Sequence, residues 1–195
     1  MVTSEHLVAG IEVAVERYGR PETRHYILDV SANQFDYWSG VAQRRPAEVV
    51  LALRRPDGRF LLHTKSFYPQ SVYRLLTGGV HPGEDLIAAA LREAMEETGH
   101  AAQIERFLGI LHYRFRHAGR EIPFVSYVFL LTLKDGEVQA RDLGERITGY
   151  REVPLQELSA IADELEALDP DWVEWGRFRA VAHRFLLEVM TSNDE

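Results

Sequence analysis

Three glutamates at helical spacing are the residues of this sequence best suited to chemistry. Glu93, Glu96 and Glu97 stand at i, i+3 and i+4, which places them within an arc of about 100° on a helix. Like charges at this spacing repel one another, and the C-terminal end of a helix favours cations. Hard divalent cations prefer carboxylate oxygens and leave coordination positions for phosphates. The cluster therefore indicates a divalent-cation site for phosphoryl chemistry, with a solvated charged face as the alternative interpretation.

Other residues near this cluster have physical uses of their own. Arg92 precedes Glu96 by four residues, so it can pair with that carboxylate. Glu84 stands at the expected helix start, two turns before Arg92. A bond between them and a simple first-turn charge are both open. Gly78 and Gly79 permit a tight loop whose backbone can approach a metal ion or a phosphate. Zinc and copper fit poorly, because no His/Cys arrangement accompanies the glutamates.

The elements that must position these residues can be read from periodicity and turn signals. A helix over 84–98 is expected between Pro82-Gly83 and Gly99, with a separate face of Ile87, Ala90, Leu91 and Ala94 directed at a sheet. Strands are expected over 48–54, 59–65, 72–76, 104–116, 122–133 and 146–153, and helices over 5–18, 154–168 and from Pro170, with Asp169 as N-cap. Residues 24–39 give no clear prediction. This order predicts an α/β fold in which helices pack on a mixed sheet.

Composition excludes several classes of protein. The chain has 195 residues, a formal charge of −8 and no cysteine, so disulfides, thiolate metal sites and thiol nucleophiles are absent. The acidic balance disfavours a nucleic-acid partner. No apolar run approaches the roughly 18 residues of a membrane span, and the first residues lack a secretion signal. We therefore expect a cytoplasmic protein without membrane association.

The complete spacing resembles a known signature. Gly78, five residues, Glu84, seven residues and then Arg92-Glu93-Ala94-Met95-Glu96-Glu97-Thr98-Gly99 is similar to the box of the Nudix hydrolases, with all seven fixed positions present. A chance match along the chain has a probability of about 10⁻⁶ at average residue usage. His100 is a departure, since the family usually has an apolar residue there. The resemblance covers about residues 45–160. We expect an N-terminal extension over 1–44, partly helical and a possible dimer contact, and a C-terminal helical segment over 161–195 that packs on the domain.

The resemblance implies an α/β/α sandwich around a mixed sheet and hydrolysis of a pyrophosphate bond in a nucleoside diphosphate linked to another group. The N- and C-terminal helical extensions lie outside the resemblance and are expected from helical spacing. It implies Mg²⁺ or Mn²⁺ held by Glu93, Glu96 and Glu97, with a backbone carbonyl of Gly78 or Gly79, and supporting roles for Arg92 and Glu84. Glu97 is the first candidate for the general base, followed by Glu93. Glu145 resembles an acidic loop residue of some members. The alternative is a catalytically silent nucleotide-binding or regulatory module.

Substrate contacts are less well specified by the sequence. Lys65 and Arg74, on expected strands, are candidates for phosphate binding, and Tyr73 is a candidate for stacking on a base. Arg114 belongs to a basic group at an expected hairpin and is a further candidate for polyphosphate. No submotif identifies the leaving group. The apolar faces of the extensions, including a stripe with Trp172 and Trp175, lead us to expect a homodimer or additional core packing.

Overall fold

Seven strands form one mixed sheet in the computed structural model, which describes residues 8–45, 47–134 and 136–192. The strand order is β1-β5-β6-β2-β4-β3-β7. The pairs β1–β5 and β6–β2 are parallel and the others are antiparallel. The strands are β1 (Glu22–Asp29), β2 (Ala47–Arg54), β3 (Phe60–Lys65), β4 (Arg74–Gly79), β5 (Ala102–His117), β6 (Arg120–Leu133) and β7 (Ile147–Val153).

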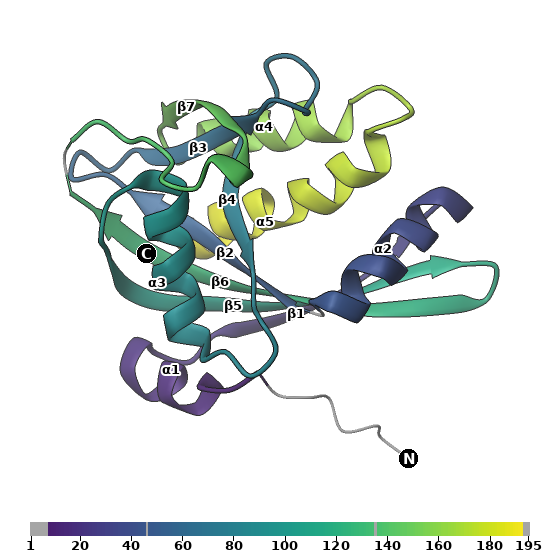
Figure 1. The fold of residues 1–195 in the computed structure, drawn as a ribbon, viewed down its shortest axis with the longest axis horizontal. Helices are drawn as coiled ribbons and strands as arrows, with labels where there is room; N and C mark the ends of the chain where they lie inside the picture. The colour runs from purple at the N-terminus through teal and green to yellow at the C-terminus, as the bar shows by residue number, and fades with distance from the viewer. Residues whose placement is uncertain (1–7, 46, 135, 193–195) are drawn as a thin grey trace.

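Helices cover both faces of the sheet, as Figure 1 shows. They are α1 (Ile11–Tyr18), α2 (Ala32–Arg44), α3 (Leu86–Thr98), α4 (Glu157–Glu166) and α5 (Val173–Thr191), with a short 3₁₀ turn, η1 (Leu143–Glu145), before β7. Buried residues of α1 and α3 pack on one face, and those of α2, α4 and α5 pack on the other. The expected α/β/α arrangement around a mixed sheet is confirmed.

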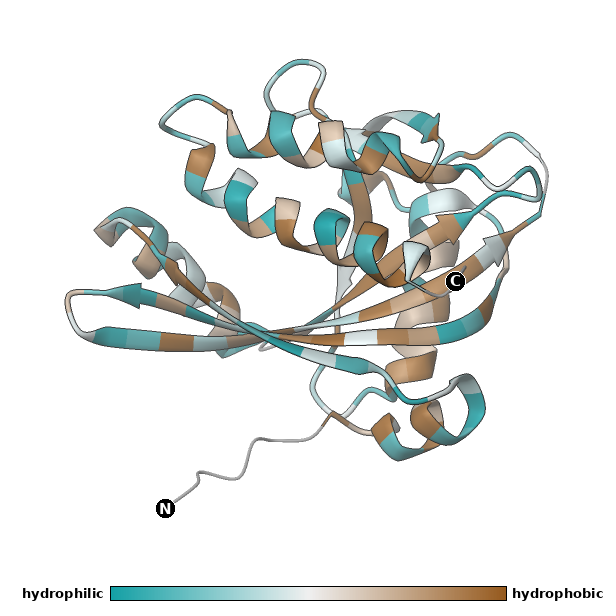
Figure 2. Ribbon diagram, turned by 180° about the vertical axis from the view of Figure 1, so that it is seen from behind, coloured by the Kyte–Doolittle hydropathy of each residue, from teal (hydrophilic) through white to brown (hydrophobic). Residues whose placement is uncertain are grey.

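The two faces are packed by different kinds of side chain. Under α2 and α5 the core is aromatic: the Trp38 ring lies 4.4 Å from that of Phe115 and 4.7 Å from that of Phe178. Under α3 the helix contributes small residues, Ala89 and Ala90 among them, which bring its backbone close to the sheet. Figure 2 shows the hydrophobic residues concentrated in the central strands, while the helices alternate along their length. Close approach of α3 lets glutamate carboxylates on that helix reach the strands below.

Most expected elements are present, and the exceptions have physical causes. The segment without a clear prediction, 24–39, covers most of β1 and most of α2. Burial of Phe35, Trp38 and Val41 in α2 depends on contacts distant in sequence. The last helix begins at Val173 rather than Pro170, because residues 170–172 form a turn in which the Trp172 backbone N–H donates to the Asp169 carbonyl. The placement of Leu91 on the sheet face was wrong: it is 37% exposed. Residues 5–7 of the first expected helix lie outside the described residues.

The predicted extensions share the sheet and core of the middle region. β1 pairs with β5 along eight residues, from Glu22 opposite Gly109 to Asp29 opposite Arg116, and Trp175 of α5 is buried in the aromatic core. The exact domain boundaries stay a prediction. Among the helices of the described residues, none has the length and apolar character that crossing a membrane requires.

Candidate active site

The helix α3 is held at both ends by local interactions. The Asp85 carboxylate accepts hydrogen bonds from the backbone N–H groups of Ile87 and Ala88, at 3.0 and 3.1 Å, which caps the N-terminus. Gly99 ends the helix with a left-handed backbone, φ 76°. On the sheet-facing side Glu93 and Glu97 are buried together with alanines, while Glu96 is half-buried. Two of the three glutamates of α3 therefore lie in the protein interior.

Arg92 is the centre of an ion-pair network that joins the helix to the preceding loop. Its guanidinium donates to both oxygens of Glu84, at 2.7 and 2.9 Å, and to Glu93 and Glu96, at 2.8 and 2.9 Å. One more donor reaches the carbonyl of Gly79 at 3.0 Å. Glu84 also accepts the backbone N–H of His81. This single side chain therefore neutralises two helix carboxylates and fixes the loop over 79–84 against the helix.

Glu97 has a different cation beside it. The Lys65 ammonium lies 3.1 Å from Glu97 Oε1 and also pairs with Glu145 of η1. Both Glu97 oxygens are buried, and within the described residues neither has a hydrogen-bond partner of good geometry, so the contact with Lys65 is a close electrostatic one. His63 Nδ1 is 3.6 Å away. The structure thus brings together Glu97, Glu145 and Lys65, which are far apart in sequence.

Gly78 makes room for Glu93. A Cβ at position 78 would lie 1.7 Å from the Glu93 Cδ atom and 2.0 Å from its Oε2, distances that no pair of non-bonded atoms tolerates. The carboxylate therefore rests directly on the Gly78 backbone. In this structure a carboxylate approaches the Gly78 backbone, and the expected approach of that backbone to a metal ion or a phosphate stays a prediction.

Burial raises the proton affinity of the two inner carboxylates. Loss of hydration raises the pKa of Glu97 to about 8, against the opposing effect of the Lys65 and Arg74 charges. The pKa of Glu93 is raised for the same reason, with Arg92 acting in the opposite direction. A carboxylate with a raised pKa is a stronger base near neutral pH. Burial therefore makes these two carboxylates stronger proton acceptors than solvated glutamates.

The donor set fits a hard divalent cation, although the carboxylates do not form a ready cage. In the described part of the chain, no three His, Cys, Asp or Glu side chains are close enough together to hold a metal ion. Glu93 and Glu96 are drawn to Arg92, and Glu97 is drawn to Lys65. Carboxylate oxygens are nevertheless the ligands that Mg²⁺ and Mn²⁺ prefer. The two unsatisfied oxygens of Glu97 are available to such an ion.

The substrate candidates occupy different places. Arg74 is 3% exposed, and its guanidinium donates to the Tyr68 hydroxyl and to Thr77. It is therefore a buried side chain whose donors are engaged within the protein. Tyr73 packs beside Gly149 of β7. Arg114 pairs with Glu121 near the end of the β5–β6 hairpin, which extends away from α3 in Figure 1. The structure does not bring Arg114 to the carboxylate cluster.

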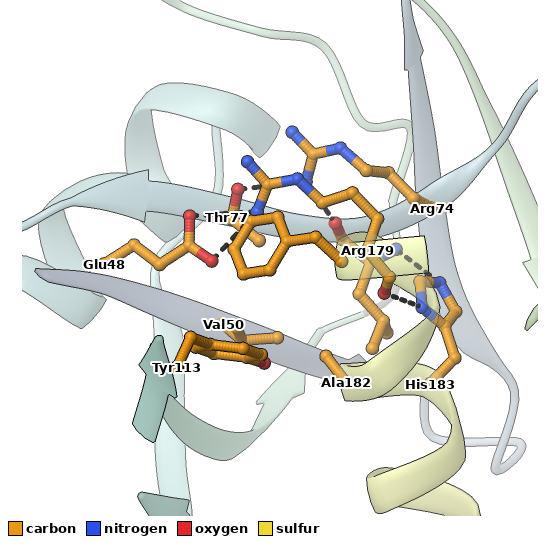
Figure 3. A pocket seen from close by; sticks show the side chains of 10 residues that line it. Glu48, Val50, Arg74, Thr77, Tyr113, Arg179, Ala182 and His183 are labelled. Carbon is orange, nitrogen blue, oxygen red and sulfur yellow. Dashed lines mark hydrogen bonds and ion pairs between the residues drawn. The ribbon is translucent and has the colours of Figure 1, made fainter. Parts of the chain in front are cut away.

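A second polar cluster under α5 was not anticipated from the sequence. Figure 3 shows Glu48, Arg74, Arg179 and His183 around one hollow. Arg179 donates to both Glu48 oxygens at 2.9 Å, and the Leu75 N–H donates to His183 Nε2. The hollow is about 10 Å³, room for a single water molecule. The cluster is therefore an ion pair inside the core, and the hollow beside it is too small for a nucleobase. Its members come from β2, β4 and α5, and no local spacing connects them.

Comparison with known proteins identifies the family of this chain. The model of the NUDIX domain matches residues 43–176. The chain is similar to an ADP-ribose pyrophosphatase of Methanocaldococcus jannaschii, with 28% identity over 131 residues that cover 67% of this chain and 75% of that protein. Among solved structures it is similar in fold to a UDP-X diphosphatase, with a TM-score of 0.52 and 17% identity over 82% of this chain and 72% of that one. An Ap4A hydrolase of C. elegans gives a TM-score of 0.48 at 23% identity, over 75% and 96% of the two chains. On the match of the domain model to residues 43–176, the chain belongs to the Nudix family.

Proposed function

We propose that this protein is a divalent-metal-dependent hydrolase of the pyrophosphate bond in a nucleoside diphosphate linked to another group. The observation that carries the proposal is the position of Glu97, whose two buried oxygens lack hydrogen bonds in the described structure while Glu93 and Glu96 lie on the same helix. A buried carboxylate without hydrogen bonds is costly. A bound cation would offset that cost. Family membership supports the same reading.

Glu93, Glu96 and Glu97 would hold Mg²⁺ or Mn²⁺, together with the backbone carbonyl of Gly78. The Gly79 carbonyl is a weaker candidate because it already accepts from Arg92. When bound, the ion would neutralise phosphate charge and lower the pKa of the attacking water. Arg92 and Glu84 would keep the helix and the loop in register through their ion pair.

The chain's own carboxylates would carry the proton. In the reaction, the oxygen of water bonds to one phosphorus, the bridging P–O bond breaks, and the bridging oxygen leaves on the other phosphate, which gives two monophosphates. Glu97 is our first candidate to accept the proton of the attacking water, because its two carboxylate oxygens have no hydrogen-bond donor in the described structure. Glu93 is the second, and Glu145 is the third through its place beside Lys65.

The substrate is proposed only to the level of a nucleoside diphosphate derivative, the class to which ADP-ribose belongs, and no nucleic-acid partner is expected. A relative named as an ADP-ribose pyrophosphatase supports that class. Homodimerisation through residues 1–44 and a cytoplasmic location stay predictions. Measurement of the solution mass of the full-length chain tests the dimer.

The function is tested by release of nucleoside monophosphate from a panel of nucleoside diphosphate derivatives, with Mg²⁺ and with Mn²⁺. We expect turnover of at least one compound, and loss of at least about 100-fold in Glu97→Gln, since removal of a metal ligand or base has effects of this size. Glu164→Gln, an exposed position on α4, is the matched control and should keep full activity. Tight nucleotide binding with no turnover under either metal would favour the catalytically silent module instead.

A further inference from the structure

Lysine is rare in this chain, and one lysine lies inside the candidate site. The sequence has two lysines, Lys65 and Lys134, although lysine and arginine together number 22. Lys134 is exposed, after β6. Lys65, the last residue of β3, is 8% exposed. A buried lysine requires a compensating partner. Lys65 obtains two, Glu97 from the helix and Glu145 from η1.

Lys65 and Arg92 hold the carboxylates in different ways. Arg92 donates to Glu84, Glu93 and Glu96 and to the Gly79 carbonyl, so its planar guanidinium is fixed from several directions. Among the described residues the Lys65 ammonium has no such set of acceptors: it pairs with two carboxylates, and its contact with Glu97 lacks the geometry of a hydrogen bond. A lysine is a compact charge on a flexible four-carbon stem. Of the two cations, Lys65 is therefore the one that can exchange partners.

A divalent ion on Glu97 would compete with Lys65 for the same carboxylate. The ammonium lies 3.1 Å from Glu97 Oε1, and Mg²⁺ binds carboxylate oxygen at about 2.0–2.1 Å. The two cations would then be only a few ångströms apart, on one carboxylate, in a largely buried place where their repulsion is poorly screened. The stronger charge would keep the carboxylate, and the ammonium would leave it.

We propose that Lys65 is an exchangeable internal cation: it pairs with Glu97 and Glu145 while the protein is metal-free, is displaced from Glu97 when a divalent ion binds, and then pairs with a phosphate of the substrate. This inference rests on the proposed function and adds an order of events to it. Diphosphate binding is coupled to metal loading, because the ammonium that meets the phosphate is engaged by carboxylates until the ion arrives.

The first test follows the ammonium itself. In full-length protein labelled with ¹⁵N-lysine, exchange of the side-chain ammonium protons with water is measured by NMR, with Lys134 as the internal control and Lys65→Arg to assign the signal. We expect slow exchange at Lys65 in metal-free protein, several-fold faster exchange at saturating Mg²⁺, and slow exchange again after addition of α,β-methylene-ADP. Lys134 should not change in any of these states.

The second test separates metal binding from substrate binding. By calorimetry, Lys65→Met should bind Mg²⁺ about tenfold more tightly, because a competing charge is gone, and its Mg²⁺-loaded form should bind α,β-methylene-ADP about tenfold more weakly, because a charge-assisted contact is lost. Lys134→Met should leave both affinities unchanged. A lysine with a merely structural role would not move the two affinities in opposite directions, and thermal unfolding shows whether the variant is folded.

The outcomes distinguish this inference from the function beneath it. If Mg²⁺ binds and turnover occurs while Lys65 exchange stays slow, or if that exchange is already as fast as that of Lys134 before metal is added, the displacement is refuted and the hydrolase is retained. If metal frees the ammonium and the analogue does not slow it again, the phosphate contact is refuted. If neither Mg²⁺ nor Mn²⁺ binds and no compound is turned over, both proposals fall.

Discussion

Replacement of Gly78 by alanine tests whether the position of the Glu93 carboxylate matters for catalysis. The backbone of Gly78 has an ordinary φ, so alanine is not excluded by conformation there. The new methyl group would instead lie 1.7 Å from Glu93 Cδ. Carbon atoms in contact prefer about 3.5–4.0 Å, so the carboxyl group must move by about 2 Å. The substitution thus displaces one carboxylate without removing it.

The expected effect can be worked from that displacement. A misplacement of about 1 Å at a reacting centre costs about 100-fold in rate, so a shift of about 2 Å should lower kcat/KM by at least that factor, or about 2.7 kcal/mol of transition-state stabilisation. Overpacking should cost about 1–3 kcal/mol of stability, which leaves the protein folded at 25 °C if it has ordinary stability.

The neighbouring glycine provides a matched control. A Cβ at Gly79 meets the side chain of Arg45 at 2.5 Å, and a flexible side chain can move aside. We therefore expect Gly79→Ala to stay within about tenfold of the parent, a change of at most about 1.4 kcal/mol, in the same metal-dependent assay. Urea unfolding of both variants separates loss of folding from loss of activity. Full activity in a folded Gly78→Ala protein would refute the argument that Glu93 acts from this position.

Three further predictions concern the core. Burial lowers the pKa of His183 from 6.5 to about 4, so the unfolded chain takes up a proton first. Stability should fall as the pH drops from about 6.5 to about 4, by up to about 3 kcal/mol, and urea unfolding of His183→Gln should depend less on pH. Arg179→Met leaves Glu48 buried without its cation and should cost about 3–5 kcal/mol in chemical denaturation; adding Glu48→Gln should restore much of it, and no recovery would contradict the ion-pair argument. In Gly176→Ala the methyl would lie 2.0 Å from the Leu165 carbonyl oxygen; we expect a loss of about 1–3 kcal/mol, and an unchanged melting temperature would show that α4 and α5 can separate freely.

The parts of the fold that follow from local signals were predictable. The helix α3 is marked by Gly99 at its end and by a strong periodic pattern, and the structure begins it at Leu86, two residues later than expected from Glu84. The later start follows from Asp85, whose carboxylate is the cap. The hairpin turn after Arg55 and the long β5–β6 pair were likewise visible in the sequence. In each case a turn or cap residue acts within a few positions of itself.

The parts that depend on distant contacts were not predictable. Nothing near Trp38 in sequence shows that its ring will stack on Phe115 and meet Phe178, and this packing stabilises a helix that has a weak local pattern. The same holds for the candidate site. Lys65 and Glu145 are each candidates from the sequence, but no local signal shows that they meet. The Lys65 ammonium lies between the carboxylates of Glu97 and Glu145 because β3 pairs with β7 and brings the loop before β7 over the helix.

The structure also changes the reason for expecting a metal ion. In the sequence, repulsion among the glutamates of the expected helix indicates an external cation. In the folded protein that repulsion is already offset by Arg92, which pairs with Glu93 and Glu96, and by Lys65, which pairs with Glu97. Repulsion alone is therefore no argument for metal. The reason to expect a metal ion is instead a difference between the carboxylates beside the two cations. The contacts of Arg92 with its carboxylates are complete, whereas Glu97, beside Lys65, keeps two buried oxygens without hydrogen bonds in the described structure. If the fold needed only internal neutralisation, both groups of carboxylates would be satisfied equally, so the unsatisfied Glu97 is where an exchangeable ion has a reason to bind.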